Sequence, residues 1–151
     1  MVDLIQFTNA TVDAFRRIPD LVTALGGDPN AISGYIDRNP DANSWSLAVY
    51  QMPPGSLLVI WQETLFSEGE MEAWMHRYQY FIRARRGDSA LTLINLLVDG
   101  IPVPGDGQRW RYCPLMDGLL PTQITEIARL TDSEGIDYYA VTTATNETGD
   151  A

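Results

Sequence analysis

One stretch of the sequence, "WMHRYQYFIRARRGD" at residues 74–88, gathers the side chains best suited to chemistry. It contains the only histidine, His76, and four of the ten arginines. Basic residues interleaved with aromatics are typical of a nucleic-acid surface, a catalytic patch or a strand at a subunit interface. His76 has the chemistry of a general base, but an interior strand position favours a structural histidine.

Motifs for metals and cofactors are absent or incomplete. The chain has one histidine and one cysteine, Cys113, and this pair cannot supply the ligands of a zinc site. Neither a P-loop nor a dinucleotide-binding glycine motif is present. Asp37, Asn39 and Asp41 alternate in "DRNPDAN" as in a calcium loop, but the glycine and the glutamate that such a loop requires later are missing. The sequence therefore predicts no metal, no cofactor and no enzymatic activity.

Length and charge restrict the possible functions further. The 151 residues predict one domain, 1–151, and 45% hydrophobic residues are enough for a core. The net charge is −10, and every basic residue is arginine. This charge opposes tight binding to nucleic acid, because binding requires that phosphates be neutralised. No apolar run is long enough to span a membrane, and the first residues do not resemble a secretory signal.

The elements that precede residues 74–88 must position that stretch in the fold. "TVDAFRRIPDLVTALGGD" has helical spacing interrupted at Pro19, which predicts a kinked or two-piece helix that stops at Gly26. "AISGYIDRNPDAN" predicts a short strand and a polar turn. "NSWSLAVYQMPPG" fits a helix capped by Asn43 or Ser44, although a strand remains possible because the run is short.

The stretch that begins at Trp74 is predicted to be a strand that Gly87 ends. The preceding "SLLVIWQETLF" is rich in β-formers, and "SEGE" suits a hairpin connection between the two. A helix would also place Trp74, Tyr78 and Phe81 on one face, so periodicity alone leaves both possibilities open. As a strand, it places His76, Tyr78, Tyr80, Ile82 and Ala84 on one face and Arg77, Gln79, Phe81, Arg83 and Arg85 on the other.

The C-terminal half completes an α+β domain. "GDSALTLINLLVDG" predicts a helix capped by Asp88 or Ser89, with an apolar stripe that begins at Leu91 and includes Ile94, Leu97 and Val98. A long Pro/Gly-rich loop follows at about residues 101–121, and the two β-rich runs after it predict a hairpin. The expected fold is a mainly antiparallel sheet of about four to five strands packed with three to four helices.

The order of these segments resembles the small tail-terminator (tail-completion) proteins of long-tailed bacteriophages. "FRRIPDLVTALGGD", "SLAVYQMPPGSLLVIWQET" with "MHRYQYFIRAR", and the closing "EGIDYYAVTTATNETGD" carry the resemblance, with the helix "SALTLINLLVDG" between the last two. The resemblance implies a virion protein of the tail or neck, assembled in the host cytoplasm without catalysis or cofactor. It also implies a ring, typically a hexamer, that caps the tail tube, meets the head–tail connector proteins and lets DNA pass through its lumen.

The resemblance suggests a role for the arginines. Arg83, Arg85 and Arg86 are candidates for the subunit boundary or for the contact with the tail tube, where the neighbour's carboxylates would meet them. The alternative is that they are solvated or paired within the subunit. Two other functions remain open: a nucleic-acid-binding module that stacks bases on the aromatics of this strand, and a small-molecule-binding α+β domain.

Overall fold

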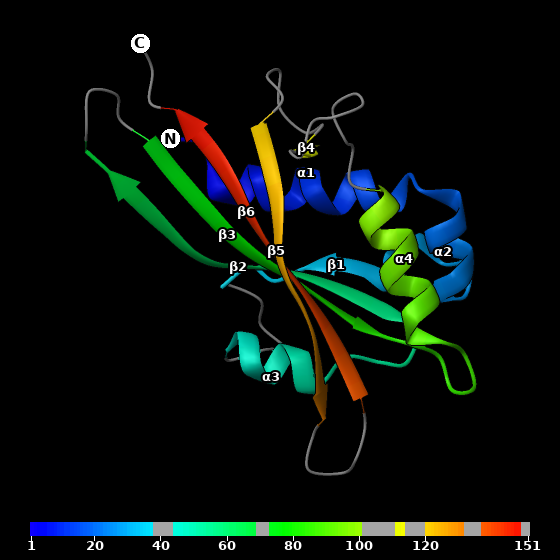
Figure 1. Cartoon of the computed structure of the whole chain (residues 1–151). Helices are drawn as coiled ribbons and strands as arrows, with labels where there is room; N and C mark the ends of the chain where they lie inside the picture. The colour runs from blue at the N-terminus through cyan, green and yellow to red at the C-terminus, as the bar shows by residue number, and fades with distance from the viewer. Residues whose placement is uncertain (38–43, 69–72, 101–110, 114–119, 132–136, 149–151) are drawn as a thin grey trace.

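A six-stranded sheet runs through the molecule and carries helices on both faces (Figure 1). The computed structural model describes residues 1–37, 44–68, 73–100, 111–113, 120–131 and 137–148. The strand order is β1-β2-β3-β6-β5-β4. The elements are α1 (Leu4–Arg16), α2 (Pro19–Leu25), the 3-10 turn η1 (Pro29–Ala31), β1 (Ile32–Gly34), α3 (Trp45–Tyr50), β2 (Ser56–Ser67), β3 (Ala73–Arg83), α4 (Ala90–Gly100), β4 (Arg111–Cys113), β5 (Leu120–Thr131) and β6 (Asp137–Thr148).

The predicted α+β class is confirmed, and the sheet is mainly antiparallel. β1 pairs with β2 in parallel over three residues, while β2–β3, β3–β6, β6–β5 and β5–β4 are antiparallel. The hairpins β2–β3 and β5–β6 are therefore joined in the middle of the sheet by the β3–β6 ladder. The strand count exceeds the prediction because β4 forms inside the segment that we predicted to be a loop.

The larger core lies on the face covered by α1, α2 and α4, which we call the α1 face. Phe7, Leu21 and Leu97 come from these three helices and are buried against β-strand residues such as Tyr80 and Val141. Residues in β3 alternate between the two faces, so every second side chain points into this core. Burying this much apolar surface is the main force that holds the helices to the sheet.

The first helix is longer than predicted, and the break after it occurs as predicted. Asp3 caps α1 by accepting hydrogen bonds from the backbone N–H groups of Ile5 and Gln6, so the helix begins at Leu4 rather than near Thr11. Pro19 starts α2 at the first helical position, where a missing N–H costs nothing.

A close approach at Gly34 fixes where α1 crosses the sheet. A Cβ atom at this position would lie 2.9 Å from the Cγ2 of Thr8 and 3.2 Å from that of Val12, both on α1. Only glycine leaves room for the helix to pass this close to β1.

The opposite face of the sheet, the α3 face, is covered only in part. α3 is a helix, as one of the two interpretations predicted, and Ser44 caps it through the N–H of Leu47. Its Ala48 and Val49 pack on a small core that includes Leu58, Ile60, Phe81, Tyr138 and Ala140.

Two predictions for the C-terminal half need correction. Ser89 caps α4 as expected, but Leu91 is exposed and Leu93 is buried instead, so the apolar stripe was set out of phase at its start. The predicted loop at residues 101–121 is not a loop throughout: residues 111–113 form β4 and β5 begins at Leu120. The predicted hairpin is confirmed in its two strands, and its turn lies outside the described residues.

Candidate functional site

β3 carries the predicted site, and its faces differ from the sequence expectation. His76, Tyr78 and Tyr80 do point together, into the α1 face. The other face is not simply basic, because Phe81 is buried beneath α3. The strand also ends at Arg83, so Arg83 and Arg85 do not project from one face of a single strand, and that prediction was wrong.

Arg83 is held by its own subunit. Its Nη1 donates a 2.6 Å hydrogen bond to the carbonyl of Met52, and its guanidinium lies 5.4 Å from the ring centroid of Tyr138. These two contacts, a cation–π interaction and a hydrogen bond from the same guanidinium, give Arg83 a structural role within its own subunit. The remaining donors of Arg83 are still available at the half-exposed surface.

Arg85 packs on a tight turn and pairs locally. Its Nε donates to Asp88 over 2.6 Å, an ion pair between two exposed side chains. Its aliphatic carbons lie against Gly55, where a Cβ would come within 2.6 Å of the Arg85 Cγ and 2.4 Å of the carbonyl oxygen of Leu25. Gly55 also has a φ of 75°, so glycine is required there twice over.

Arg86 differs from its two neighbours. Its side chain is exposed, and we find no ion pair for it among the described residues. It lines an open hollow of ≈ 570 Å³ together with Arg83, Asp88 and Tyr139. Of the three predicted arginines, it is the one without an ion pair or hydrogen bond to the residues that the structure describes, and the interface role of all three stays a prediction.

His76 belongs to a buried hydrogen-bond network that joins three strands. Its imidazole is fully buried; Nε2 lies 2.7 Å from the Glu147 carboxylate on β6 and Nδ1 lies 2.9 Å from the Thr64 hydroxyl on β2. The indole N–H of Trp61 also donates to Thr64, over 2.9 Å. A carboxylate can only accept, so Nε2 carries a proton and, in the neutral imidazole, Nδ1 accepts from Thr64.

The network also holds the start of the chain. Glu147 accepts a 3.1 Å hydrogen bond from the N–H of Val2 and lies 3.4 Å from the N-terminal ammonium of Met1. Burial by itself raises the pKa of Glu147, but the hydrogen bonds from His76 and Val2 and the ammonium charge outweigh it, so the pKa lies below its ordinary value. With both ring nitrogens engaged, His76 offers no atom to a substrate, which supports the structural interpretation. Nothing in the sequence near His76 pointed to Glu147.

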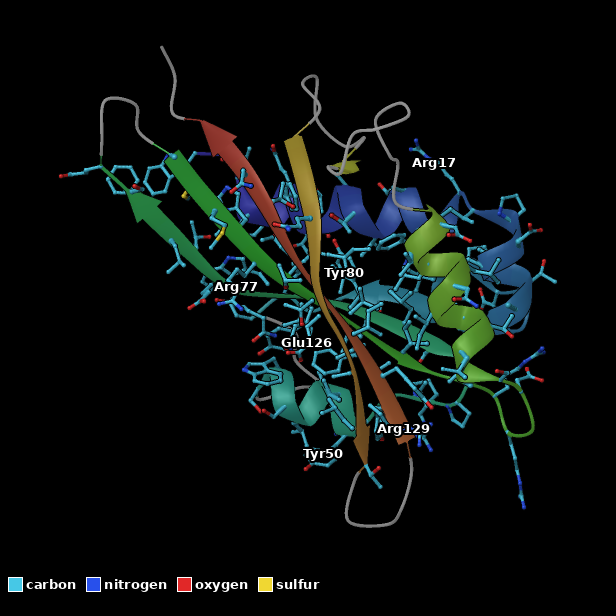
Figure 2. The ribbon with its side chains drawn as sticks, viewed as in Figure 1. Arg17, Tyr50, Arg77, Tyr80, Glu126 and Arg129 are labelled. Carbon is cyan, nitrogen blue, oxygen red and sulfur yellow. The ribbon has the colours of Figure 1, made fainter. Side chains whose placement is uncertain are left out.

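Two observations weigh against a base-stacking surface on this strand. The rings of Tyr78, Tyr80 and Phe81 are buried, and stacking requires exposed aromatic faces. Figure 2 shows Arg17, Arg77 and Arg129 well apart on the molecule, so these basic side chains do not form one patch.

A cavity of ≈ 430 Å³ lies between α1, α3 and β2. It is lined by apolar and aromatic side chains, among them Ile5, Tyr35, Trp45 and Trp61. The side-chain amide nitrogen of Gln62, also in its wall, is buried without a hydrogen-bond partner among the described residues. An unsatisfied buried donor is uncommon, so this cavity is a candidate site for a small ligand.

Within the described ranges, no group of three or more histidine, cysteine or acidic residues could hold a metal ion. The predicted absence of a calcium site concerns the loop at residues 37–43, most of which lies outside the described residues. Among the residues that the structure describes, no helix is long and apolar enough to cross a membrane.

Comparisons with known proteins show a likeness of fold. No protein-family model and no curated protein matches the chain. Among solved structures, a chain in the virion of a native gene transfer agent (GTA) particle aligns with a TM-score of 0.52 and 12% sequence identity, over 94% of this chain and 94% of that chain. At this identity the alignment establishes a shared fold over nearly the whole length of both chains.

Proposed function

We propose that this chain is a structural protein of a virion, specifically a tail terminator whose copies form a ring, typically a hexamer. The ring caps the tail tube, meets the head–tail connector proteins and lets DNA pass through its lumen. The observation that carries the proposal is the fold shared with a chain of a gene transfer agent virion over 94% of each chain. The order of sequence segments supports the same function independently.

The physical character of the molecule fits this function. A subunit that lines a passage for DNA must not hold it, and a net charge of −10 disfavours contact with phosphates. The proposed function needs no catalytic residue and no cofactor, and it agrees with a histidine whose two ring nitrogens are both engaged within the structure. We place the protein in the tail or neck of the virion after assembly in the host cytoplasm.

Arg86 is the residue through which we expect a subunit to meet its neighbour or the tail tube. The hollow beside it also contains Arg83, so a carboxylate from outside would meet two guanidinium groups. Arg85 supports this contact mainly by shaping the surface, since it is already paired with Asp88 in its own subunit.

The mass of the protein in solution tests the proposal. Sedimentation velocity and native mass spectrometry should find a discrete ring-sized species, and electron microscopy should find it at the ends of tail tubes. Arg86→Glu should weaken ring formation or tube binding, whereas Arg17→Glu, an exposed arginine elsewhere on the surface, should not. A strict monomer at high concentration would overturn the proposed function.

The cavity beside Gln62 favours a second candidate, a small-molecule-binding domain. Such a ligand would place an acceptor on the free amide donor and apolar atoms against Trp45 and Trp61. A thermal-shift screen against wild type and Gln62→Leu separates the two functions. A hit that depends on Gln62, together with a monomeric protein, would favour the ligand-binding alternative.

A further inference from the structure

β2 and β5 are the long strands nearest the two sides of the sheet. Among the described residues, the outward backbone edge of each is largely unpaired. β1 covers β2 only at residues 57–59, and the N–H of Tyr35 adds one bond to the carbonyl of Val59. Beyond this point, residues 61–67 of β2 pair with β3 alone. At the opposite side β4 covers residues 120–122 of β5, and residues 123–130 pair with β6 alone.

These two edges also expose apolar side chains. Trp61, Leu65 and Phe66 are exposed on β2, and Ile127 and Leu130 are exposed on β5. A monomeric protein usually protects a long outer strand with charges, proline or a covering element, because free backbone groups beside apolar side chains pair with other chains. Figure 1 shows the end of β2 reaching past the helices. The strand order makes β5 the long strand on the other side of the sheet.

The direction of the strands makes the two edges complementary. β2 to β3, β3 to β6 and β6 to β5 are each antiparallel, so β5 runs opposite to β2 within one sheet. A second copy placed beside the first in the same orientation brings its β5 against the first copy's β2 in antiparallel register. The contact leaves a free β5 on one copy and a free β2 on the other, so it can repeat.

β2 and β5 each contain one register shift, and the regular segments beyond these shifts have the same length. β2 has a register shift between Trp61 and Glu63, and β5 has one between Ile124 and Glu126. Residues 63–67 and 126–130 lie past these shifts and are regular. Phe66 and Ile127 both project on the α1 face, because Phe66 pairs with Trp74 and Ile127 with Val141. Placing Phe66 opposite Ile127 keeps each face of the sheet continuous from copy to copy.

We propose that copies of this chain join edge to edge, with residues 63–67 of β2 in one subunit forming an antiparallel ladder with residues 126–130 of β5 in the next. The partner is a second copy of the chain, and the inference rests on the proposed assembly into a ring. A heterologous contact of this kind closes into a ring when the rotation between neighbours closes. The ring then contains one continuous sheet.

Two single variants and their mixture test the contact. Leu65→Lys places a charge at the β2 edge and Ile127→Lys at the β5 edge, where the wild-type side chains are 46% and 49% exposed. Leu91→Lys on α4 is the control, since Leu91 is 59% exposed and lies on neither edge. We expect each edge variant to fold, as judged by circular dichroism, and to need at least ~10-fold higher concentration to assemble, a loss of about 1.4 kcal/mol per contact.

The mixture distinguishes head-to-tail pairing from a symmetric contact. The Leu65→Lys variant keeps a competent β5 edge, and the Ile127→Lys variant keeps a competent β2 edge. Mixed in equal amounts at a concentration where each alone is monomeric, they should form a dimer and nothing larger, because only one competent contact exists between them. Sedimentation velocity reads this directly.

Each other outcome counts against the inference. Edge variants that assemble like wild type, a mixture that remains monomeric, or equal loss in Leu91→Lys overturns edge pairing while wild-type rings keep the proposed function intact. A monomeric wild-type protein overturns the proposed function itself, and the edge contact with it.

Discussion

The network around Glu147 gives the sharpest test of how this fold is held together. We expect Glu147→Ala to destabilise the protein far more than Glu63→Ala, although both glutamates accept a 2.7 Å bond from a β3 side chain. The Glu147 side chain is 13% exposed and its partner His76 is fully buried, whereas Glu63 and Arg77 are 47% and 41% exposed.

The magnitudes follow from these environments. Removing Glu147 leaves a buried imidazole donor unsatisfied, at a cost of about 1–3 kcal/mol, and removes the bond to Val2, worth about 1 kcal/mol. The sum of about 2–4 kcal/mol corresponds to a fall in Tm of roughly 5–15 °C for a chain of this size. Removing Glu63 breaks a solvent-exposed ion pair and should cost no more than about 0.5–1 kcal/mol.

Urea unfolding followed by circular dichroism measures both variants, and pH supplies a second readout. The pKa of Glu147 is lowered in the folded protein, so its stabilising charge is present above the pKa of the unfolded carboxyl, about 4.3. The stabilisation is lost as the pH falls through the folded pKa, so the gap between wild type and Glu147→Gln should narrow in acid. Equal effects of the two alanine variants, or a gap that does not depend on pH, would refute the reasoning.

Three further predictions follow from other parts of the molecule. Gly55→Ala should cost at least about 2 kcal/mol, because its φ is positive and its Cβ would collide with the carbonyl of Leu25, while Gly27→Ala, with a positive φ but open space, should cost about 1 kcal/mol in the same unfolding assay. A fluorescence titration should find no appreciable binding to duplex or single-stranded DNA at physiological salt, and submicromolar affinity with a steep salt dependence would contradict it. Calcium should leave the Tm unchanged, because "DRNPDAN" lacks two required residues, and a rise of several degrees would make Asp37, Asn39 and Asp41 ligands.

Most of the fold could be predicted from the sequence because local signals agree with the tertiary structure. Pro19 marks the break between two helices, Ser44 and Ser89 act as caps, and the β-rich runs pair as hairpins. The errors occur where tertiary contacts determine which side chains are buried. Leu91 and Leu93 are equally apolar, and only the position of the helix on the sheet buries the second.

The candidate site was harder to predict because its groups come together from distant parts of the chain. His76 was correctly interpreted as structural, but its partners Thr64 and Glu147 lie on two other strands, and no spacing in the sequence connects them. The arginines were assigned to one strand face because the strand was expected to continue to Arg85. It stops at Arg83, the last residue of β3 that pairs with β2.

The strand order has a consequence for the timing of folding and assembly. The two hairpins are local, but the central ladder joins positions as distant in the chain as Tyr80 and Val141, and closing so long a loop slows folding. An isolated two-stranded hairpin is only marginally stable in water, so each hairpin gains stability when the β3–β6 ladder forms. Docking requires β6, and therefore the ribosome must synthesise residues 137–148 before the sheet and its two outer edges exist. Subunits would then join through a complete sheet only after residues 137–148 have been made.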